Sequence, residues 1–514
     1  MRRLWLAGLV VWVGCASAPI RKADQVALTD ADALVLQGCY DCLLEARATY
    51  ERVAVGRARP LVITRLFETN LLIALREKEL ALDWSAALER ARALVPGLPP
   101  GTEGERYLSI ADAIPPDLNG WSRREYGEFQ RPRMGFYTQA DAEIAWLQTG
   151  ILAAPVRQYL TLALDCGYPA PRPTPTRPAS RISIPPVPPD APPLLVYRGG
   201  ICRSVNADAM EQVRARVPKF VETSYFLARL VVAVAQKAGP GKGRELLTEV
   251  YARFPASPSV TYLYGSFNQL IGDCRPALRY YDETLAIKNV HEDALLGRAV
   301  CLTFLKRTDE AIAAATVIVD LRLDNLALGY YWRAWNRHFK KELDLARADI
   351  TSAKALRSRA DIFLLAGIIE YDQKDLSPAL KDLTAALDME RESCSAMWYL
   401  GLVHMDLKNF AQSGGHFENA MGCYETRVLA SEASLKEMEA RQDLDAEFKA
   451  RQIAGFEAAI KEDRSQYHAS AFNAANLYAQ AGRLEKTKTL IEIAAQDPAL
   501  ADMVSQLRKI IGGR

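Results

Sequence analysis

The sequence lacks the motifs by which common enzyme classes and metal centres are recognised. It has no Gly-rich phosphate loop followed by Lys, no serine nucleophile elbow and no helix with paired His ligands for zinc. Only five His occur, scattered and without metal-ligand neighbours at suitable spacing. The sequence therefore predicts no catalytic residues, no metal site, no cofactor and no small-molecule substrate.

An excess of charge of one sign is also missing. Lys and Arg number 64 and Asp and Glu number 62, which leaves a formal net charge of +2. Nucleic-acid-binding surfaces need a surplus of cations, so no nucleic-acid partner is expected. Beyond the N-terminus, apolar runs are short. The best of them, residues 226–235, falls well below the roughly 20 residues of a membrane span and is interpreted as a buried helix.

The first fifteen residues have the composition of an export signal. Arg2 and Arg3 precede a short apolar run, residues 4–13, which ends at Gly14 and Cys15. This segment resembles the signal peptide of bacterial lipoproteins, in which the Cys is lipidated, although Trp12 stands where Leu is usual. The resemblance implies a lipid anchor on Cys15 and a place on the periplasmic side of the cell envelope, at the outer membrane. A plain cleaved signal, an uncleaved anchor and a cytoplasmic protein are the alternatives.

Eight further cysteines remain once Cys15 is assigned to the lipid. An oxidising compartment would permit disulfides among them. Three local pairs are candidates: Cys39 with Cys42, Cys166 with Cys202, and Cys394 with Cys423. Alternatively, several of them are small buried hydrophobes. The CxxC at residues 39–42 lies in a helical context without a βαβ unit, which favours a structural role over redox catalysis.

A repeat of about 34 residues organises the second half of the chain. Small residues recur at Gly243, Ala277, Ala311, Ala346, Ala379 and Ser413, separated by 34, 34, 35, 33 and 34 residues. Twelve residues before each lies a second register: Val231, Gly265, Ala299, Ala334, Gly367 and Gly401. Such spacing is typical of stacked helical hairpins whose two helices approach closely at the small residues.

This register resembles that of the tetratricopeptide repeat family. The resemblance implies an all-α fold, an α-solenoid of about seven hairpins, with the array over residues 218–423 and a final repeat and capping helix over 468–514. Residues 16–167 are expected to form an N-terminal helical domain with similar hairpins. Eleven prolines between 168 and 193 exclude a helix there and predict a proline-rich linker over 168–200. Residues 194–197 are expected to add a short strand or to dock.

The register is interrupted once, by about 40 extra residues at 424–467. This stretch is strongly charged and carries a sparse apolar stripe at helical spacing. It predicts two long helices with a break near residues 443–445, which either project as a hairpin or lengthen their neighbours. A solvated insertion without function and an arm that docks a partner or a second copy are both compatible with the pattern.

Aromatic residues mark the candidate binding surface. In the tetratricopeptide family the first helix of each hairpin lines a concave groove. The resemblance places eight side chains on or beside that lining: Tyr262, Tyr331, Trp332, Trp335, His338, Tyr371, Trp398 and Tyr399. Aromatic rings suit peptide capture, and aromatic grooves bind proline-rich ligands in particular. The alternative is that several of these rings pack between hairpins.

The resemblance and the absences lead to one leading hypothesis. We expect a non-enzymatic envelope scaffold that binds other proteins, or extended or proline-rich peptides, in an assembly such as secretin, pilus, motility or outer-membrane biogenesis machinery. A regulator or accessory subunit of a periplasmic cell-wall enzyme is the second hypothesis. An enzyme with an unrecognised site in residues 97–165 is the third.

Overall fold

The computed structural model describes residues 20–55, 59–117, 123–133, 139–167, 185–201, 205–232 and 241–512. The described residues form helices and no β-strand. Two compact units are present: Met1–Leu118 with Glu128–Leu227, and Asn119–Gly127 with Ala228–Arg514. Cys15 and most of the proline-rich stretch, residues 168–184, lie outside the described residues.

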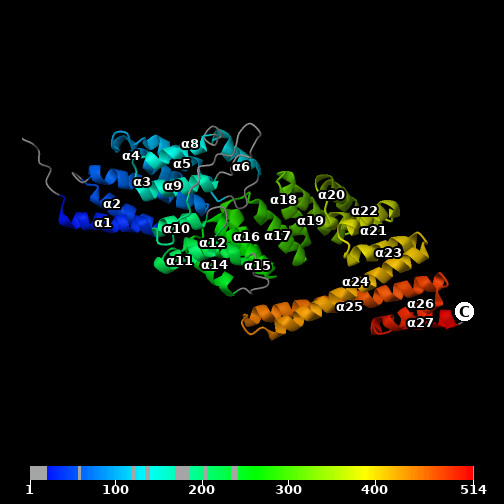
Figure 1. The fold of residues 1–514 in the computed structure, drawn as a ribbon. Helices are drawn as coiled ribbons and strands as arrows, with labels where there is room; N and C mark the ends of the chain where they lie inside the picture. The colour runs from blue at the N-terminus through cyan, green and yellow to red at the C-terminus, as the bar shows by residue number, and fades with distance from the viewer. Residues whose placement is uncertain are drawn as a thin grey trace, which may run out of the picture. The chain divides into compact units, whose positions relative to one another are not determined.

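The N-terminal unit is built from helices that pack on their chain neighbours (Figure 1). Its helices are α1 (Lys22–Gln37), α2 (Tyr40–Val53), α3 (Arg59–Glu79), α4 (Ser85–Leu94), α5 (Gly104–Ala113), α8 (Ala140–Thr149), α9 (Ala154–Gly167), α10 (Pro193–Gly200), α11 (Ala207–Arg216) and most of α12 (Glu222–Val232). Helix α6 (Arg123–Gln130) spans the division between the units. One apolar core joins α3, α4, α5, α8, α9 and α10.

The predicted linker is too long at its C-terminal end. Residues 193–200 form α10, and Leu194 and Tyr197 are completely buried. Of the two expectations for residues 194–197, the strand is wrong, whereas docking holds, because Leu194 and Leu195 join the N-terminal core. Pro193 begins the helix, where a proline is tolerated because the first-turn N–H groups have no intrahelical acceptor. Leu194 lies against the αL turn at Gly38, where an added Cβ would come within 2.5 Å of the Leu194 side chain. Residues 185–227 therefore belong to the N-terminal unit.

The C-terminal unit is a stack of helical hairpins. After α14 (Gly241–Arg253) come α15 (Pro258–Leu270) with α16 (Cys274–Ile287), α17 (Glu292–Phe304) with α18 (Thr308–Asp320), α19 (Leu326–Phe339) with α20 (Leu343–Leu356), α21 (Ala360–Asp372) with α22 (Leu376–Met389), and α23 (Cys394–Asp406) with α24 (Phe410–Ala440). Each helix packs on the next. The first helix of a hairpin is called its A helix below, and the second its B helix.

The small residues of the repeat lie at the closest approach of A and B helices. Ala277, Ala346 and Ala379 are fully buried. A Cβ added at Gly367 would meet Leu383 at 2.5 Å, and one at Gly401 would meet Phe417 at 2.9 Å. Large side chains of the B helices thus occupy the space that the glycines leave. The predicted all-α fold and its tetratricopeptide-type solenoid are confirmed.

The turns between A and B helices share one backbone conformation. One residue in each lies in the left-handed region: Gly272, Lys306, Lys341, Lys374 and Lys408, with Gly482 in the last repeat. This conformation ends the A helix and turns its final carbonyl groups toward the N–H groups of the turn. The lysines are unusual here, because a Cβ makes the left-handed region unfavourable.

The 424–467 insertion lengthens two repeat helices. Helix α24 runs on to Ala440, and α25 (Ala446–Gln480) continues without a break into the A helix of the last repeat. The chain turns at 441–445, where the Asp445 carboxylate accepts the N–H of Phe448 at 2.9 Å and caps α25. The unit ends with α26 (Leu484–Ala494) and α27 (Ala501–Gly512). Among the described residues, every helix is too short or too polar to cross a bilayer.

Candidate protein-binding surface

The A helices form the inner, concave side of the array. Successive A helices contact one another directly: α15 with α17, α17 with α19, α19 with α21, and α21 with α23. Successive B helices approach one another less, so the stack bends toward the A helices. Since each A helix packs against B helices on its other side, its accessible face is the concave one.

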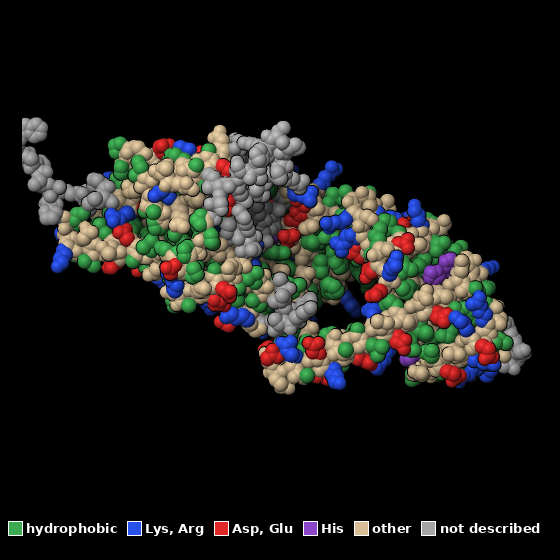
Figure 2. Space-filling model, viewed as in Figure 1, with side chains coloured by type: hydrophobic (Ala, Val, Ile, Leu, Met, Phe, Trp, Pro, Cys, Tyr) green, Lys and Arg blue, Asp and Glu red, His purple; other side chains and the backbone are tan. Residues whose placement is uncertain are grey.

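Half-buried apolar side chains recur on this concave face in three of the A helices and are called the apolar stripe below. Leu296 and Val300 in α17 are equivalent in the repeat to Leu364 and Ile368 in α21. In α23, Leu402 is equivalent to Val300 and Ile368, and Met405 lies about one helical turn further on. All six side chains are only half buried. Figure 2 shows a recess with hydrophobic side chains between the array and the α24–α25 hairpin. Half-exposed apolar side chains aligned over several repeats form a surface that is suited to an apolar segment of a partner.

The predicted aromatic residues take part in the packing of the array. All eight lie on A helices, Tyr331 is buried, and the other seven are half-buried. Trp332 packs between the clusters of two neighbouring hairpins, and Trp398 makes an edge contact with Phe417 at 5.1 Å between ring centroids. Tyr371 and Tyr399 contact each other in the same way at 5.9 Å. These rings therefore pack both within hairpins and between them.

Tyr262, Trp335 and His338 complete the predicted set. Tyr262 lies 4.8 Å from the His291 ring, and Trp335 packs on the α19–α21 cluster. The His338 Nε2 atom lies 2.9 Å from the Asp372 carboxylate of the next A helix. These contacts join neighbouring repeats. The aliphatic residues of the stripe were not predicted from the sequence, although their positions in the 34-residue register could have identified them.

Ion pairs run between repeats along the A–B turns. The Lys341 ammonium lies 3.3 Å from Asp372, and Lys374 lies 3.1 Å from Asp406, in each case one repeat further on. Lys374 also lies 4.7 Å from the centre of the Tyr371 ring. These exposed pairs are individually weak in water. They offset part of the strain of a left-handed lysine and give this edge alternating charge.

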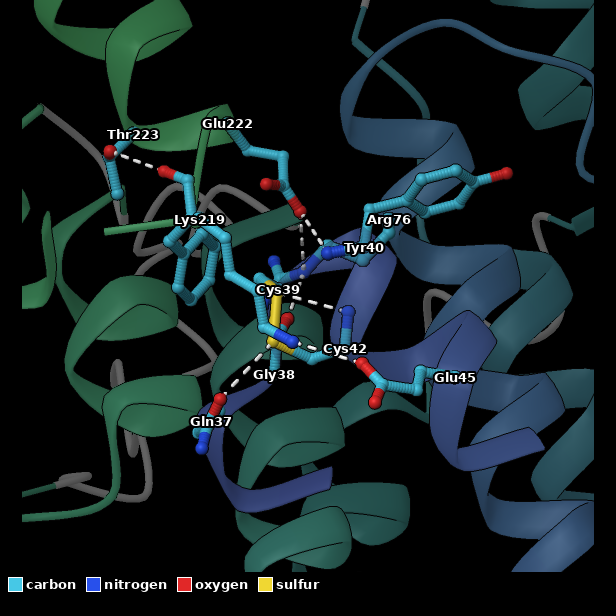
Figure 3. The surroundings of a disulfide bond; sticks show 11 residues. Gln37, Gly38, Cys39, Tyr40, Cys42, Glu45, Arg76, Lys219, Glu222 and Thr223 are labelled. Carbon is cyan, nitrogen blue, oxygen red and sulfur yellow. Dashed lines mark hydrogen bonds and ion pairs between the residues drawn. A yellow bond between two sulfur atoms is a disulfide. The ribbon is translucent and has the colours of Figure 1, made fainter. Parts of the chain in front are cut away.

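A buried disulfide links Cys39 and Cys42 at the start of α2 (Figure 3). Both residues are completely buried, and the Cys42 N–H donates to the Cys39 sulfur at 3.0 Å. The Nε of Arg76 donates to the carbonyl of Gly38 at 2.9 Å, and the carboxylate of Glu222 accepts the N–H of Tyr40. Side chains of α3 and α12 thus bind the same turn that the disulfide closes. This arrangement assigns the disulfide a structural role.

Two further disulfides lie in the repeat array. Cys394 bonds to Cys423, and Cys274 bonds to Cys301, a pair that we did not predict because its members lie in different hairpins. Cys166 takes part in a disulfide, whereas Cys202, its predicted partner, lies outside the described residues. No group of three or more His, Cys, Asp or Glu within the described ranges is arranged to hold a metal ion.

The segment 97–165 was the proposed place for an unrecognised enzyme site. Its buried carboxylates in the described residues are Glu143 and Asp165, on separate helices. Glu143 accepts from the Arg106 guanidinium at 2.8 Å, and that guanidinium also lies over the Trp146 ring. A hollow of about 500 Å³ beside the loop from Leu98 to Arg106 has mixed polar and apolar walls. The ion pair is a packing arrangement that joins α5 to α8.

Comparison with known proteins gives similarity in fold. No protein-family model matches the chain, and no curated protein matches it by sequence. MamA is 19% identical over 32% of this chain and 95% of its own, with a TM-score of 0.29. YrrB, described as a TPR protein with an unusual peptide-binding site, is 15% identical over 37% of this chain and 97% of its own, with a TM-score of 0.31. A chain of the APC/C hetero-tetramer Cut9–Hcn1 is 12% identical over 95% of this chain and 96% of its own, with a TM-score of 0.43.

Proposed function

We propose that this protein is a scaffold that binds a segment of another protein along the concave face of its repeat array. The apolar stripe on α17, α21 and α23 carries this proposal, because it recurs in three repeats and is only half buried. Binding there would remove apolar surface from water, and the associated free energy is about 25 cal/mol per Å². Neighbouring repeats would each contribute a small part.

We further propose that the protein works in the bacterial cell envelope, anchored on its periplasmic side by lipid on Cys15. The signal-like first fifteen residues support this, as do the disulfides Cys39–Cys42, Cys274–Cys301 and Cys394–Cys423, since such bonds persist in oxidising compartments. A multiprotein assembly such as secretin, pilus, motility or outer-membrane biogenesis machinery is the proposed setting. Radiolabelled palmitate should enter the protein but not a Cys15→Ala variant. Labelling of both would refute the anchor.

Partner capture from detergent-solubilised envelopes tests the concave face. Ile368→Glu and Leu402→Glu place a charge in the stripe and should abolish capture of the proteins that the unaltered chain retains. Leu345→Glu is a matched control, because Leu345 is an exposed leucine on the B helix α20. Far-ultraviolet circular dichroism should show equal helix content in all variants. Undiminished capture by both stripe variants would refute the proposal.

A further inference from the structure

The α24–α25 hairpin reaches back to the beginning of the array. The guanidinium of Arg451 on α25 lies 3.0 Å from the carboxylate of Asp273, in the turn between α15 and α16. Gln452 donates to the carbonyl oxygen of Ile271 in the same turn at 3.4 Å. Phe448, one helical turn earlier, is completely buried. The tip of the hairpin is therefore docked on the first complete hairpin rather than solvated.

The hairpin is long enough for its tip to reach the turn between α15 and α16. Helix α24 has 31 residues and α25 has 35, so together with their repeat portions they extend about 46 and 52 Å at 1.5 Å per residue. The two helices pack along each other, and Arg427 on α24 pairs with Asp463 on α25 at 3.1 Å. No loop lies at the base of the hairpin, because both helices continue from repeat helices. It projects from the array as a stiff strut (Figure 1).

The geometry determines which face the strut covers. It joins the last repeats to the first, so it lies as a chord across a curved array. A chord lies on the concave side of the curve, which is the side of the A helices and their apolar stripe. Figure 2 shows the recess that remains between the strut and the array. A ligand in this recess would lie between the A helices on one side and the α24–α25 hairpin on the other.

The contact at the tip is suited to opening. Arg451 and Asp273 keep 32% and 26% of their side-chain surface exposed, so water and salt screen their attraction. Arg451 also has a second acidic partner on its own helix, Glu447, at 2.8 Å. Within the described residues, α25 makes no extensive contact with either α15 or α16, so side chains at the tip carry the docking. Opening would leave the hairpin itself intact.

We propose that residues 424–467 form a clasp that closes the concave face around an extended polypeptide segment of the partner. The segment enters when the Arg451–Asp273 contact opens and is retained when it closes. A folded domain is excluded by the closed clasp, whereas an extended apolar chain fits along the stripe. This inference rests on the proposed function, since it assumes that the concave face binds polypeptide.

The distance across the clasp tests its opening directly. Spin labels on bioorthogonal amino acids at Gln442 and Arg275, two exposed positions, avoid interference from the native disulfides. We expect one short distance in the full chain, a second and longer distance in Arg451→Glu, and return to the short distance in Arg451→Glu with Asp273→Lys. Arg464→Ala is the control, because Arg464 pairs with Glu432 inside the hairpin. An unchanged distance in Arg451→Glu would overturn the clasp.

The partner class is tested with reduced, carboxymethylated lactalbumin, which stays unfolded, and with its native form. The full chain should bind the unfolded form and not the native one, and Arg451→Glu should raise both association and dissociation rates about tenfold. Equal rates in the full chain and in Arg451→Glu would overturn the enclosure of the bound segment and leave the proposal of concave-face binding intact. Failure to bind the unfolded form, or equal binding of the native form, would overturn the partner class. Undiminished binding by Ile368→Glu would instead refute the proposed function.

Discussion

Replacing Gly367 by Ala separates the packing of the repeat from helix propensity. In an open helical site this change stabilises a protein by about 1 kcal/mol, because glycine disfavours helix. At Gly367 the new methyl group would lie 2.5 Å from Cγ and 3.2 Å from the backbone nitrogen of Leu383. The backbone contact means that α21 and α22 must move apart, and overpacking of this kind costs about 1–3 kcal/mol. We expect net destabilisation of up to about 2 kcal/mol.

Gly415 supplies the matched control. It lies inside α24 with no heavy atom within 4 Å of an added Cβ, so Gly415→Ala should stabilise by about 1 kcal/mol. Urea denaturation followed by circular dichroism measures both variants. Leu383→Ala in the Gly367→Ala background should cost less than the sum of the single changes, because it removes the clashing side chain. Equal stabilisation by the two glycine replacements, or additivity with Leu383→Ala, would refute the close-packing argument.

Three further predictions concern stability. Lys408→Gly should stabilise by about 0.5–1 kcal/mol because it relieves a left-handed lysine, and Lys374→Gly should gain less because it also removes an ion pair, as urea midpoints would show. Replacing Cys394 and Cys423 by Ala should cost about 3.6 kcal/mol from the loop that their bond closes, whereas no change in midpoint would contradict this value. Burial raises the pKa of Glu68 to about 7, so its protonated form is favoured by folding. The contribution of protonated Glu68 to the free energy of unfolding is complete below pH 4.5 and is lost as the pH rises through 7. Glu68→Gln should therefore flatten the decline in stability over that pH range. An unchanged pH profile of stability would argue against the raised pKa of Glu68.

The fold was predictable because its signal is local and repeated. Glycine and alanine at fixed register positions report where two helices approach, and Gly367 and Gly401 occupy those positions in the structure. The break near residue 443 was visible because a charged, capping-rich segment interrupts two helical stripes. By contrast, helix α10 was hidden by its prolines. Local composition indicated an extended chain, whereas burial of Leu194 and Tyr197 against the N-terminal core decides the conformation.

The candidate site was only partly predictable. Aromatic residues of the A helices were found by type, but the packing of Trp332 between hairpins depends on neighbours a repeat away, and Trp398 packs on Phe417 of its own hairpin. The Arg451–Asp273 contact has no local signal at all, because its residues are separated by most of the array. Such contacts follow from the curvature of the whole stack, which accumulates from small rotations at each hairpin. The 34-residue periodicity predicts the hairpins, but it does not predict the curvature that results from the rotations between them.

The clasp and the curvature of the array are consequently coupled. Because α24 and α25 continue into repeat helices without a hinge, the direction of the hairpin is set by the last repeats, and its tip position depends on every interface between them and α15. A ligand that straightens the array would pull Asp273 away from Arg451, and one that tightens it would press them together. The tip contact therefore favours one curvature of the array. A ligand on the concave face that favours the same curvature is helped by the tip contact, and one that favours another curvature is opposed by it. By thermodynamic reciprocity, opening the clasp must change affinity on the stripe by the same factor as binding changes the opening.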